Sequence, residues 1–358
     1  MTNAIRIPAA ALRSFCARLF ATAGCSTDEA DAIAGSLVQT NLYGHDSHGV
    51  GLVPTYLRNL QQRLVNAGVT PRVVTDAGPL VGLDAQKGFG QIAGAAAMRI
   101  AIERARTHGI ALVGLANTHH LGRIGQWAEQ CAQAGFASVH FVNALSTPLV
   151  APWGGIAAKL STNPFCVGVP HAPHPVVLDY ATSAIAYGKV RVACEEGRRL
   201  APGVLIDAQG LPSDDPEVMI PERLGALLPF GEHKGYALAV MCEILGGALS
   251  GGDVQDHDPQ PSPMVNNMLS FVFAPDRLAT RERLDDAVDR LAAWLATSPP
   301  APGVTGIVLP GAPERAMARE REANGIPLPA SVRRELAACA QELGIAAADE
   351  FAHEGTPR

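Results

Sequence analysis

The sequence lacks the features that would place it in a membrane or on nucleic acid. No uncharged stretch reaches membrane-spanning length, and the opening MTNAIRIPAAALRSFCARLF carries arginines through its apolar face, unlike a signal peptide. The net charge is −6 and the basic residues form no run, which leaves no electrostatic reason to hold a polyanion. We therefore expect a cytoplasmic protein with neither membrane nor nucleic acid as a partner.

Paired cysteine motifs are also missing. The seven cysteines are an odd number scattered between Cys16 and Cys339, and no CxxC spacing occurs. This pattern predicts reduced, mostly buried thiols, and it argues against a structural zinc ion held by cysteine.

The remaining composition is typical of an α/β enzyme. At 358 residues, 47% of them hydrophobic, the chain is longer than one core usually grows, which predicts two or three domains. Amphipathic helices are expected over 26–44 and 53–68, the first with a capping box of Ser26 and Glu29, and the tail from 313 should fold back on them. Strands are expected at 79–86, 110–117, 136–144, 268–275 and 303–311, and further helices at 90–109, 123–135, 235–252 (buried) and 282–296.

The segment GFGQIAG, residues 88–94, imitates a dinucleotide-binding fingerprint without matching it. Its glycines fall at 88, 90 and 94, whereas the fingerprint needs the third glycine at 93. The strand that follows ends in Asn117, where a ribose-binding acid would be required. We expect a tight turn and close helix packing here, and no Rossmann fold.

The stretch YGHDSHGV, residues 43–50, holds two histidines within four residues. His45 and His48 have a spacing that could serve one metal ion, but no carboxylate-rich partner segment accompanies them, so no metal site is expected. Ser47 can fix the imidazole of His48 by a hydrogen bond, which indicates a catalytic pair. A plain polar turn at a helix end is the structural alternative.

A second histidine pair occurs in NTHHLGRIG, residues 117–125, between a predicted strand and a predicted helix. His119 and His120 then lie where free backbone N–H groups can meet an anion. Gly122 and Gly125 would let a phosphate approach, and Arg123 adds a positive charge for phosphate or carboxylate. The alternative is a helix start exposed to water.

Other polar clusters also follow apolar runs. We expect strand ends to project a set of polar side chains into one cleft: Thr162, Asn163, Asp179, Thr182 and Ser183. His233 and Lys234 precede Gly235 at the start of a long apolar helix, which would make a second anion site, and VLPGAPE at 308–314 repeats that layout. Together these clusters favour an enzyme that grips a large anion and moves a proton.

The motifs GHDSHG, HHLGRIG, STNPF, LDYATSAIA, EHKGYALA and LPG, in this order, resemble the malate/L-lactate dehydrogenase family that is unrelated to the Rossmann enzymes. The resemblance implies reversible reduction of a 2-oxo acid to a 2-hydroxy acid with NAD(H) or NADP(H), leaning to NAD. It also implies a homodimer and an α/β fold whose cofactor sheet is largely antiparallel. The subunit would have three parts, namely a helical domain from 1–75 and 313–358, an α/β domain from 76–120 and 225–312, and a second α/β domain at 121–224 carrying cofactor-binding segments.

The resemblance also implies site residues by position. The cofactor would be held by His48, Gly122, Arg123, Ile124, Leu178, Asp179, Tyr180, Ala181, His233, Lys234, Gly235, Asn266, Gly311, Ala312, Pro313 and Glu314. The catalytic set would be His120, His48, Ser47 and Asp179. Family members differ on which of the two histidines relays the proton; we favour His120 for a hydroxy acid, with Ser47 and His48 holding the nicotinamide or the substrate.

One position departs from the family pattern. Many members have an arginine for the substrate carboxylate where this chain has Leu52. A buried carboxylate without a partner is costly, so Arg123 is expected to serve, with Ser146 and Thr162 as further substrate contacts. An apolar residue facing the substrate suits a bulky or aromatic side chain, such as that of hydroxyphenylpyruvate.

Rival functions remain open at this point. Within the family, cyclic imino acid reduction and malate or lactate oxidation use the same hydride chemistry. Outside it, the histidine pairs could belong to a metal-dependent hydrolase, or the cleft to a ligand-binding protein without catalysis.

Overall fold

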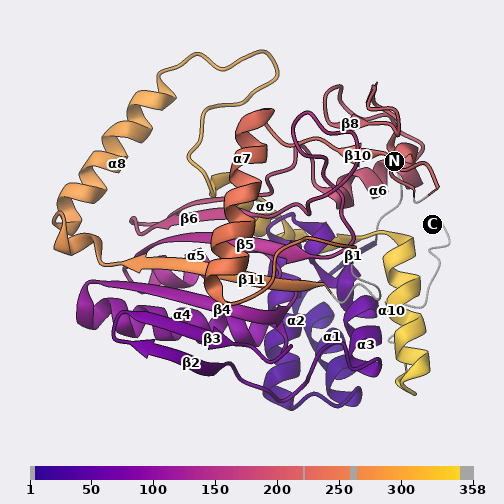
Figure 1. Cartoon of the computed structure of the whole chain (residues 1–358), viewed down its shortest axis with the longest axis horizontal. Helices are drawn as coiled ribbons and strands as arrows, with labels where there is room; N and C mark the ends of the chain where they lie inside the picture. Colours follow the sequence, from indigo (N-terminus) through magenta and orange to yellow (C-terminus); the bar gives the residue numbers. More distant parts are fainter. Residues whose placement is uncertain (1–4, 221, 259–263, 347–358) are drawn as a thin grey trace.

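The computed structural model describes residues 5–220, 222–258 and 264–346 of the chain (Figure 1). One part of it is helical and is drawn from both ends of the sequence. The side chain of Ser26 caps α2 by accepting from the amide of Glu29, as the capping box predicts. The helices are α1 (Ala9–Thr22), α2 (Thr27–Leu42), α3 (Val53–Gln61) and α10 (Ala330–Glu342), and β1 (Ile5–Ile7) pairs antiparallel with β12 (Ile326–Leu328).

The helical part has its own hydrophobic core. Residues from α1, α2 and α3 pack with Leu336 and Ala340 of α10, and the views from both sides place α10 beside α3. The expectation that the tail folds back on the N-terminal helices is therefore confirmed.

A seven-stranded sheet forms the centre of the molecule, in the order β2-β3-β4-β11-β5-β6-β7. Only β3 and β4 run parallel; the other neighbouring pairs are antiparallel. The prediction of a largely antiparallel, non-Rossmann sheet is confirmed. The strands are β2 (Arg72–Ala77), β3 (Leu80–Asp84), β4 (Ile110–His119), β5 (Ala137–Leu145), β6 (Phe165–Val169), β7 (Val176–Tyr180) and β11 (Val265–Phe273).

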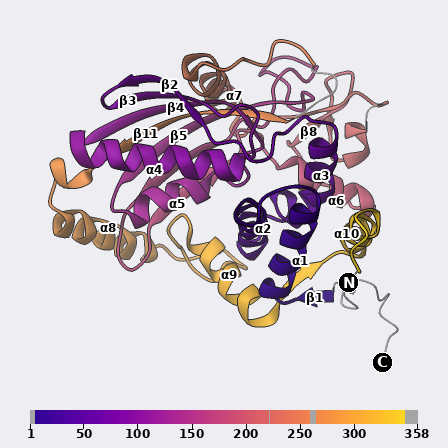
Figure 2. The ribbon, with the colours of Figure 1, turned by 90° about the horizontal axis from the view of Figure 1, so that it is seen from below.

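Helices cover both faces of this sheet (Figure 2). α4 (Gly90–His108) and α5 (Gly125–Gln133) lie on one face, and α7 (His233–Met241) lies across the other. α7 continues into a π-helical turn, η4 (Cys242–Gly247). This helix was expected to be buried, but Met241 and Ile244 are exposed because only one side of it packs on β5 and β11.

A third part lies above the sheet edge in Figure 1. It has a small hydrophobic core of its own that includes Val150, Val190 and Leu205. Its elements are α6 (Tyr187–Glu195), the 3-10 helix η3 (Pro216–Met219) and a three-stranded sheet of β8 (Leu205–Ile206), β9 (Pro212–Ser213) and β10 (Ala226–Leu227). The domain boundaries expected from the sequence stay a prediction.

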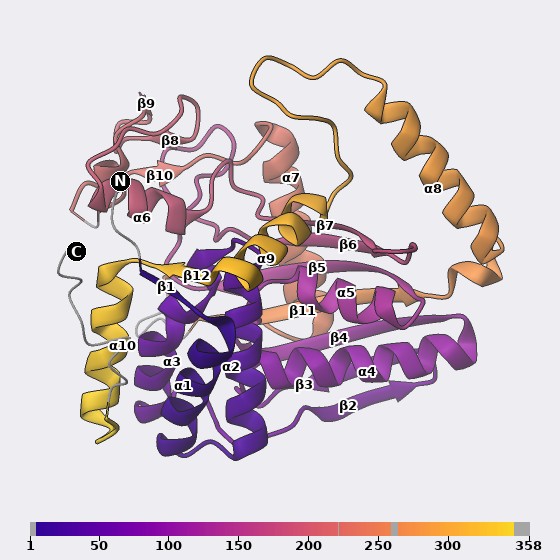
Figure 3. The ribbon, with the colours of Figure 1, turned by 180° about the vertical axis from the view of Figure 1, so that it is seen from behind.

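One predicted strand is wrong. After α8 (Arg281–Ala296), which stands apart from the sheet in Figure 3, residues 303–311 form no strand before α9 (Ala312–Asn324) begins. Their apolar residues Ile307 and Val308 are exposed, and the segment meets the sheet through one backbone bond from Val177 to Pro310. An apolar alternation alone does not make a strand when no neighbouring edge pairs with it.

The glycines that imitate a dinucleotide fingerprint serve close packing, as expected. A Cβ atom on Gly90 would lie 2.2 Å from the carbonyl oxygen of His120, and one on Gly94 would lie 2.6 Å from the ring of Trp127. The start of α4 is thereby pressed against the end of β4 and against α5. Among the described residues, no helix is long and apolar enough to cross a membrane.

Candidate functional site

Two histidines from distant segments meet beside the helical part. His48 ends the 3-10 helix η1 (Asp46–His48), which follows α2, and His120 comes directly after β4. Their ring centroids are 5.3 Å apart with 34° between the ring planes. The sequence indicated each histidine separately, and the fold brings them together.

The turn that carries His48 is held by a network that the sequence did not indicate. Arg321 of α9 donates to both carboxylate oxygens of Asp46, at 2.6 and 3.0 Å. Asn41 donates to Asp46 and accepts from the amide of Val50. Gly49 has to be glycine, because a Cβ atom there would lie 2.1 Å from the Asn41 side chain. The turn that carries His48 is therefore held by one residue from α2 and one from α9, which lie far apart in the sequence.

Ser47 lies next to His48 in the way that the sequence suggested. Its hydroxyl is 2.9 Å from Nδ1 of His48. Gly188 of α6 packs directly on this serine, since a Cβ atom on Gly188 would lie 2.2 Å from Ser47 Cβ. The serine hydroxyl thus has a partner and little freedom to turn away.

His120 is buried beside the ring of Tyr56 and is hydrogen-bonded to its hydroxyl. The hydroxyl of Tyr56 in α3 lies 2.6 Å from its Nδ1. One turn along the same helix, the amide of Asn59 lies 2.9 Å from Nε2 of His119. Tyr56 is a site residue that sequence reasoning missed, as is Gln91, whose amide donates to the Tyr56 hydroxyl; Asn59 holds only the neighbouring His119. The only available signal was the i, i+3 spacing of a tyrosine and an asparagine on one face of α3.

The electrostatic surroundings of His48 and His120 differ. Burial lowers the pKa of His120 well below its usual range, and the nearby His48 and His119 lower it further. Burial also lowers the pKa of His48, as does His45, but the carboxylate of Asp179 acts in the opposite direction. Only His48 of the two is affected by an anion that favours its protonated form.

Asp179 is the penultimate residue of β7 and lies close to the first turn of α5. Its Oδ2 accepts from the amide of Gly125 at 2.7 Å. The free helix start that was expected to bind a phosphate is therefore already capped by a side chain. Gly122 adopts the left-handed backbone (φ +75°) of a tight turn, and contact of the turn Gly122–Arg123–Ile124 with the cofactor stays a prediction.

Arg123 does not present a free charge either. Its guanidinium is buried, forms an ion pair with Glu129 at 2.5 Å and lies 4.4 Å from the ring centroid of Tyr43. A cation that is neutralised inside the protein has little left to offer a substrate carboxylate. This pairing weighs against the expected role of Arg123 as the carboxylate anchor.

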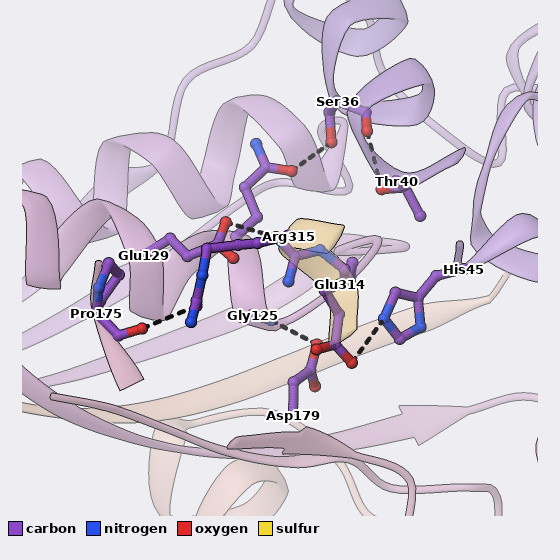
Figure 4. Close-up of polar contacts among 11 residues, drawn as sticks. Ser36, Thr40, His45, Gly125, Glu129, Pro175, Asp179, Glu314 and Arg315 are labelled. Atoms are coloured by element: carbon purple, nitrogen blue, oxygen red, sulfur yellow. Dashed lines mark hydrogen bonds and ion pairs between the residues drawn. The ribbon is translucent and has the colours of Figure 1, made fainter. Parts of the chain in front are cut away.

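Two predicted cofactor segments meet in a pocket of about 260 Å³. One comes from β7 and the other from the turn before α9, and the lining residues are Val177, Leu178, Asp179, Tyr180, Val308, Leu309, Pro310, Gly311, Pro313 and Glu314. Figure 4 shows the side chains of His45, Asp179 and Glu314 pointing toward one another. Oε2 of Glu314 is buried without a hydrogen-bond partner, and its Oε1 lies 3.8 Å from Nε2 of His45.

The pocket reaches the segment that carries His48. Glu314, which lines it, lies 3.8 Å from Nε2 of His45, three residues before His48. The carboxylate of Asp179, which also lines the pocket, acts against the larger effect of burial, which lowers the pKa of His45 and of His48. The pocket therefore offers acceptor oxygens rather than cations.

The loop before α7 has two of its amides engaged already, and the anion site expected there stays a prediction. The amides of Lys234 and Gly235 already donate to the carbonyls of Gly231 and Phe230. A Cβ atom on Gly235 would lie 2.2 Å from the Phe230 oxygen, so this glycine serves close packing. The side chains of His233 and Lys234 are exposed.

Asn266 is buried, and its side chain is already engaged. Its Oδ1 accepts from the amide of Leu121 and its Nδ2 donates to the carbonyl of Asn143. This arrangement ties the segment after His120 to β5 and β11. Asn266 therefore positions the loop between His120 and Gly122, whatever else it contacts.

The expected substrate residues lie in different surroundings. Ser146 contacts the hydroxyl of Ser161 at 3.3 Å, and the carbonyl of Thr162 accepts from Thr182. Leu52 is half-buried against the helical core, in the 3-10 helix η2 (Val50–Leu52) directly after η1. Leu52 thus stands on the segment that carries His48. Of the predicted cleft residues, Asn163 and Thr182 are fully buried. Asn163 donates to the carboxylate of Glu243, and the Thr182 hydroxyl donates to the carbonyl of Asn163.

A metal site finds no support in the described part of the chain. No group of three or more His, Cys, Asp or Glu side chains there is arranged to hold a metal ion.

Comparisons with known proteins agree with this geometry. The model of the family described as "Malate/L-lactate dehydrogenase" matches residues 7–337. The chain belongs to this family. It is 44% identical to hydroxycarboxylate dehydrogenase B of Escherichia coli over 96% of both chains, and 38% identical to an L-lactate dehydrogenase of Cupriavidus necator over 96% of this chain and 99% of that protein.

Solved structures show the same fold. An E. coli structure described as a malate/lactate dehydrogenase superposes with a TM-score of 0.92 at 44% identity over 96% of both chains. A Δ1-piperideine-2-carboxylate reductase of Pseudomonas syringae superposes with a TM-score of 0.81 at 32% identity, over 95% of this chain and 99% of that one. The chain is an oxidoreductase acting on CH–OH groups.

Proposed function

We propose that this enzyme reversibly reduces a 2-oxo carboxylic acid to the 2-hydroxy acid with NADH. The observation that carries the proposal is the pair of imidazoles, His48 and His120, whose ring centroids are 5.3 Å apart, with His48 on the segment whose His45 meets Glu314 of the pocket. Such a reaction needs a group that gives a proton to the carbonyl oxygen and a second that stabilises the charge developing there.

The pocket fits a nicotinamide cofactor and favours NAD. The orphaned oxygen of Glu314 and the carboxylate of Asp179 are acceptors suited to ribose hydroxyls, and both would repel a 2′-phosphate. The residues that would hold the cofactor there are Leu178, Asp179, Tyr180, Gly311, Pro313 and Glu314, with Ala181 and Ala312 beside them. His48, the turn Gly122–Arg123–Ile124, His233, Lys234, Gly235 and Asn266 remain further expected contacts.

A binding experiment tests this preference without turnover. NADH should bind the wild-type protein at least about tenfold more tightly than NADPH. This ratio corresponds to a repulsion of about 1.4 kcal/mol between the carboxylates and the 2′-phosphate of NADPH. Glu314→Gln should narrow that ratio by removing one of the two carboxylates. Equal affinity of the wild-type protein for both cofactors, measured by titration calorimetry, would argue against the role given to this pair.

The two histidines divide the work in this proposal. When bound, the reduced nicotinamide supplies the hydride that C2 of the 2-oxo acid accepts. His48, held by Ser47, gives a proton to the carbonyl oxygen and ends as neutral imidazole; burial lowers its pKa, and the carboxylate of Asp179 opposes that effect. His120 stays neutral and donates a hydrogen bond to the same oxygen. This division departs from the expectation that His120 alone relays the proton.

The substrate side chain is proposed to be bulky or aromatic. Leu52 offers an apolar surface on the segment that follows His48, at the position where the family resemblance implies an arginine in many members. Ser146 and Thr162 are kept as polar substrate contacts, whereas Arg123 is the weakest of the expected ones because of its ion pair with Glu129.

A second candidate is the reduction of cyclic imino acids. It is favoured by 37% identity to a Δ1-pyrroline-2-carboxylate/Δ1-piperideine-2-carboxylate reductase of Pseudomonas putida, over 79% of this chain and 85% of that protein. The same histidine pair would then serve an imine nitrogen in place of a carbonyl oxygen.

The test is a panel of 2-oxo acids and a cyclic imino acid, with the oxidation of NADH measured by its absorbance for each substrate. We expect oxidation of NADH with phenylpyruvate, hydroxyphenylpyruvate or smaller 2-oxo acids, and far slower oxidation with piperideine-2-carboxylate. A preference for the cyclic imine would establish the second candidate, and no oxidation with any substrate would refute both. EDTA should leave the rate unchanged.

The assembly and location are also proposed rather than observed. We propose a homodimer in the cytoplasm, on the strength of the family resemblance. Light scattering of the purified protein should give twice the 37.4 kDa chain mass.

A further inference from the structure

A chain of buried polar groups ends at Nδ1 of His120. Gln91 of α4, Tyr56 of α3 and His120 are all buried. The amide of Gln91 donates to the Tyr56 hydroxyl at 3.2 Å, and the same hydroxyl lies 2.6 Å from Nδ1 of His120. Side chains of α4 and α3 are thus linked in sequence to Nδ1 of His120.

The direction of these hydrogen bonds follows from Gln91, which presents its amide nitrogen to the tyrosine oxygen. The tyrosine oxygen accepts from Gln91, and it has a single proton to give. Burial raises the pKa of Tyr56 far above neutrality, so that proton stays on the hydroxyl and points to His120. Nδ1 of His120 is then an acceptor, and the one proton of the neutral ring sits on Nε2.

We propose that Tyr56 is a positioning residue that locks His120 in the Nε2–H tautomer, with Gln91 orienting the tyrosine hydroxyl. The proposal rests on the function given above, in which Nε2–H of His120 donates to the substrate oxygen. A ring in the other tautomer would present a lone pair to that oxygen and would repel the charge developing on it. No proton has to cross Tyr56, which remains a phenol throughout.

A purely structural role for Tyr56 makes a different prediction. Its ring packs against Phe20 and Phe89, and a phenylalanine would keep this packing. If Tyr56 were only a core aromatic, Tyr56→Phe would leave both the tautomer and the turnover number unchanged.

The chain offers a matched control on the same helix. Asn59 lies one turn after Tyr56, is also buried, and bonds the neighbouring ring of His119 instead of His120. Asn59→Ser removes a buried hydrogen bond to β4 without touching His120. It therefore separates general loosening of α3 from the loss of the Tyr56 hydroxyl.

The experiment combines nitrogen NMR of the cofactor-free protein with steady-state kinetics. In wild-type protein we expect a pyridine-type signal for Nδ1 and a pyrrole-type signal for Nε2 of His120. Tyr56→Phe should give a mixture of tautomers and lower kcat about 10- to 100-fold, with KM for the 2-oxo acid changed less than threefold. Asn59→Ser should keep the wild-type tautomer and kcat within about threefold.

Several outcomes would overturn the proposal. A protonated Nδ1 in the wild-type protein would refute it even if no variant folds. Tyr56→Phe with wild-type tautomer and kcat would also refute it, as would an equal loss of kcat in Asn59→Ser. If the wild-type tautomer is Nε2–H but no 2-oxo acid is reduced, the proposed function fails while the tautomer lock stands.

Discussion

At the scale of single residues, Asp179 contacts or influences three parts of the site. It accepts from the amide of Gly125, lines the pocket shared with Glu314, and opposes the effect of burial, which lowers the pKa of His45 and His48. Neutralising it should therefore change the titration of His48 as well as cofactor binding. A pH profile of kcat/KM separates the change in the titration of His48 from the change in cofactor binding. The pH at which kcat/KM falls reports an ionisation of the free enzyme.

We predict that Asp179→Asn shifts the pH profile for reduction toward lower pH. Reduction needs His48 protonated, so kcat/KM falls as pH rises through the pKa of His48. Removing the carboxylate lowers that pKa, because the protonated form loses its favourable partner. The falling limb should move to lower pH, while in Glu314→Gln, whose carboxylate is not among the groups that shift His48, it should stay in place. A limb that stays put in Asp179→Asn would contradict the assignment.

Sequence reasoning reached some of these residues and missed others for a physical reason. His48, His120, Asp179 and Glu314 lie in motifs whose polar groups interrupt apolar runs, and such an interruption is visible in one dimension. Tyr56 and Gln91 lie inside amphipathic helices, where a buried polar side chain looks like any other helical residue. Only the packing of α3 and α4 against the end of β4 gives them a role.

At the scale of elements, close contacts at glycines set the distances between α4, β4 and α5. Gly94 touches the buried ring of Trp127, and Gly90 touches the carbonyl of His120. The spacing of these glycines was enough to reject a Rossmann fingerprint, and it correctly predicted close packing. It could not indicate which element lies opposite each glycine.

We predict that Gly94→Ala destabilises the protein by about 1–3 kcal/mol through overpacking. The new Cβ atom would lie 2.6 Å from the indole of Trp127, which is fully buried and cannot turn aside. This cost should exceed the gain of up to about 1 kcal/mol from replacing a helical glycine. Gly306→Ala, with nothing within 4 Å of the new atom, is the control. Equal urea midpoints for the two variants would show that α4 can move away at no cost.

The strand order and the mistaken strand at 303–311 belong to this scale too. Apolar runs located most strands of the central sheet, but a run cannot say which neighbour it pairs with. Residues 303–311 have the composition of a strand and still form none, because β7 offers them a single backbone hydrogen bond.

For the whole molecule, several buried histidines make stability depend on pH. Burial lowers the pKa of His140 to about 3 and that of His119 to about 4. His140 lies between the hydroxyls of Ser138 and Ser270, which suit a neutral ring. Below the ordinary histidine pKa of about 6.5, the unfolded chain takes up protons that the folded chain refuses.

We predict that the free energy of unfolding falls as the pH drops from about 6.5 to 4. Each buried histidine contributes a slope of up to about 1.4 kcal/mol per pH unit in this window, and the full stability is present above it. Urea unfolding at pH 7.5 and at pH 5 measures the difference. The same stability at both values would mean that His119 and His140 are protonated in the folded protein.

The overall assignment, a histidine pair acting beside a nicotinamide pocket of a non-Rossmann fold, is tested most directly by His48→Asn and His120→Asn. In each variant kcat for the 2-oxo acid and the dissociation constant of NADH should be measured together. We predict that kcat falls by about 10²–10⁴-fold in His48→Asn and at least about tenfold in His120→Asn, with NADH affinity changed less than threefold. Wild-type turnover in either variant, or a loss that merely follows weaker NADH binding, would contradict it.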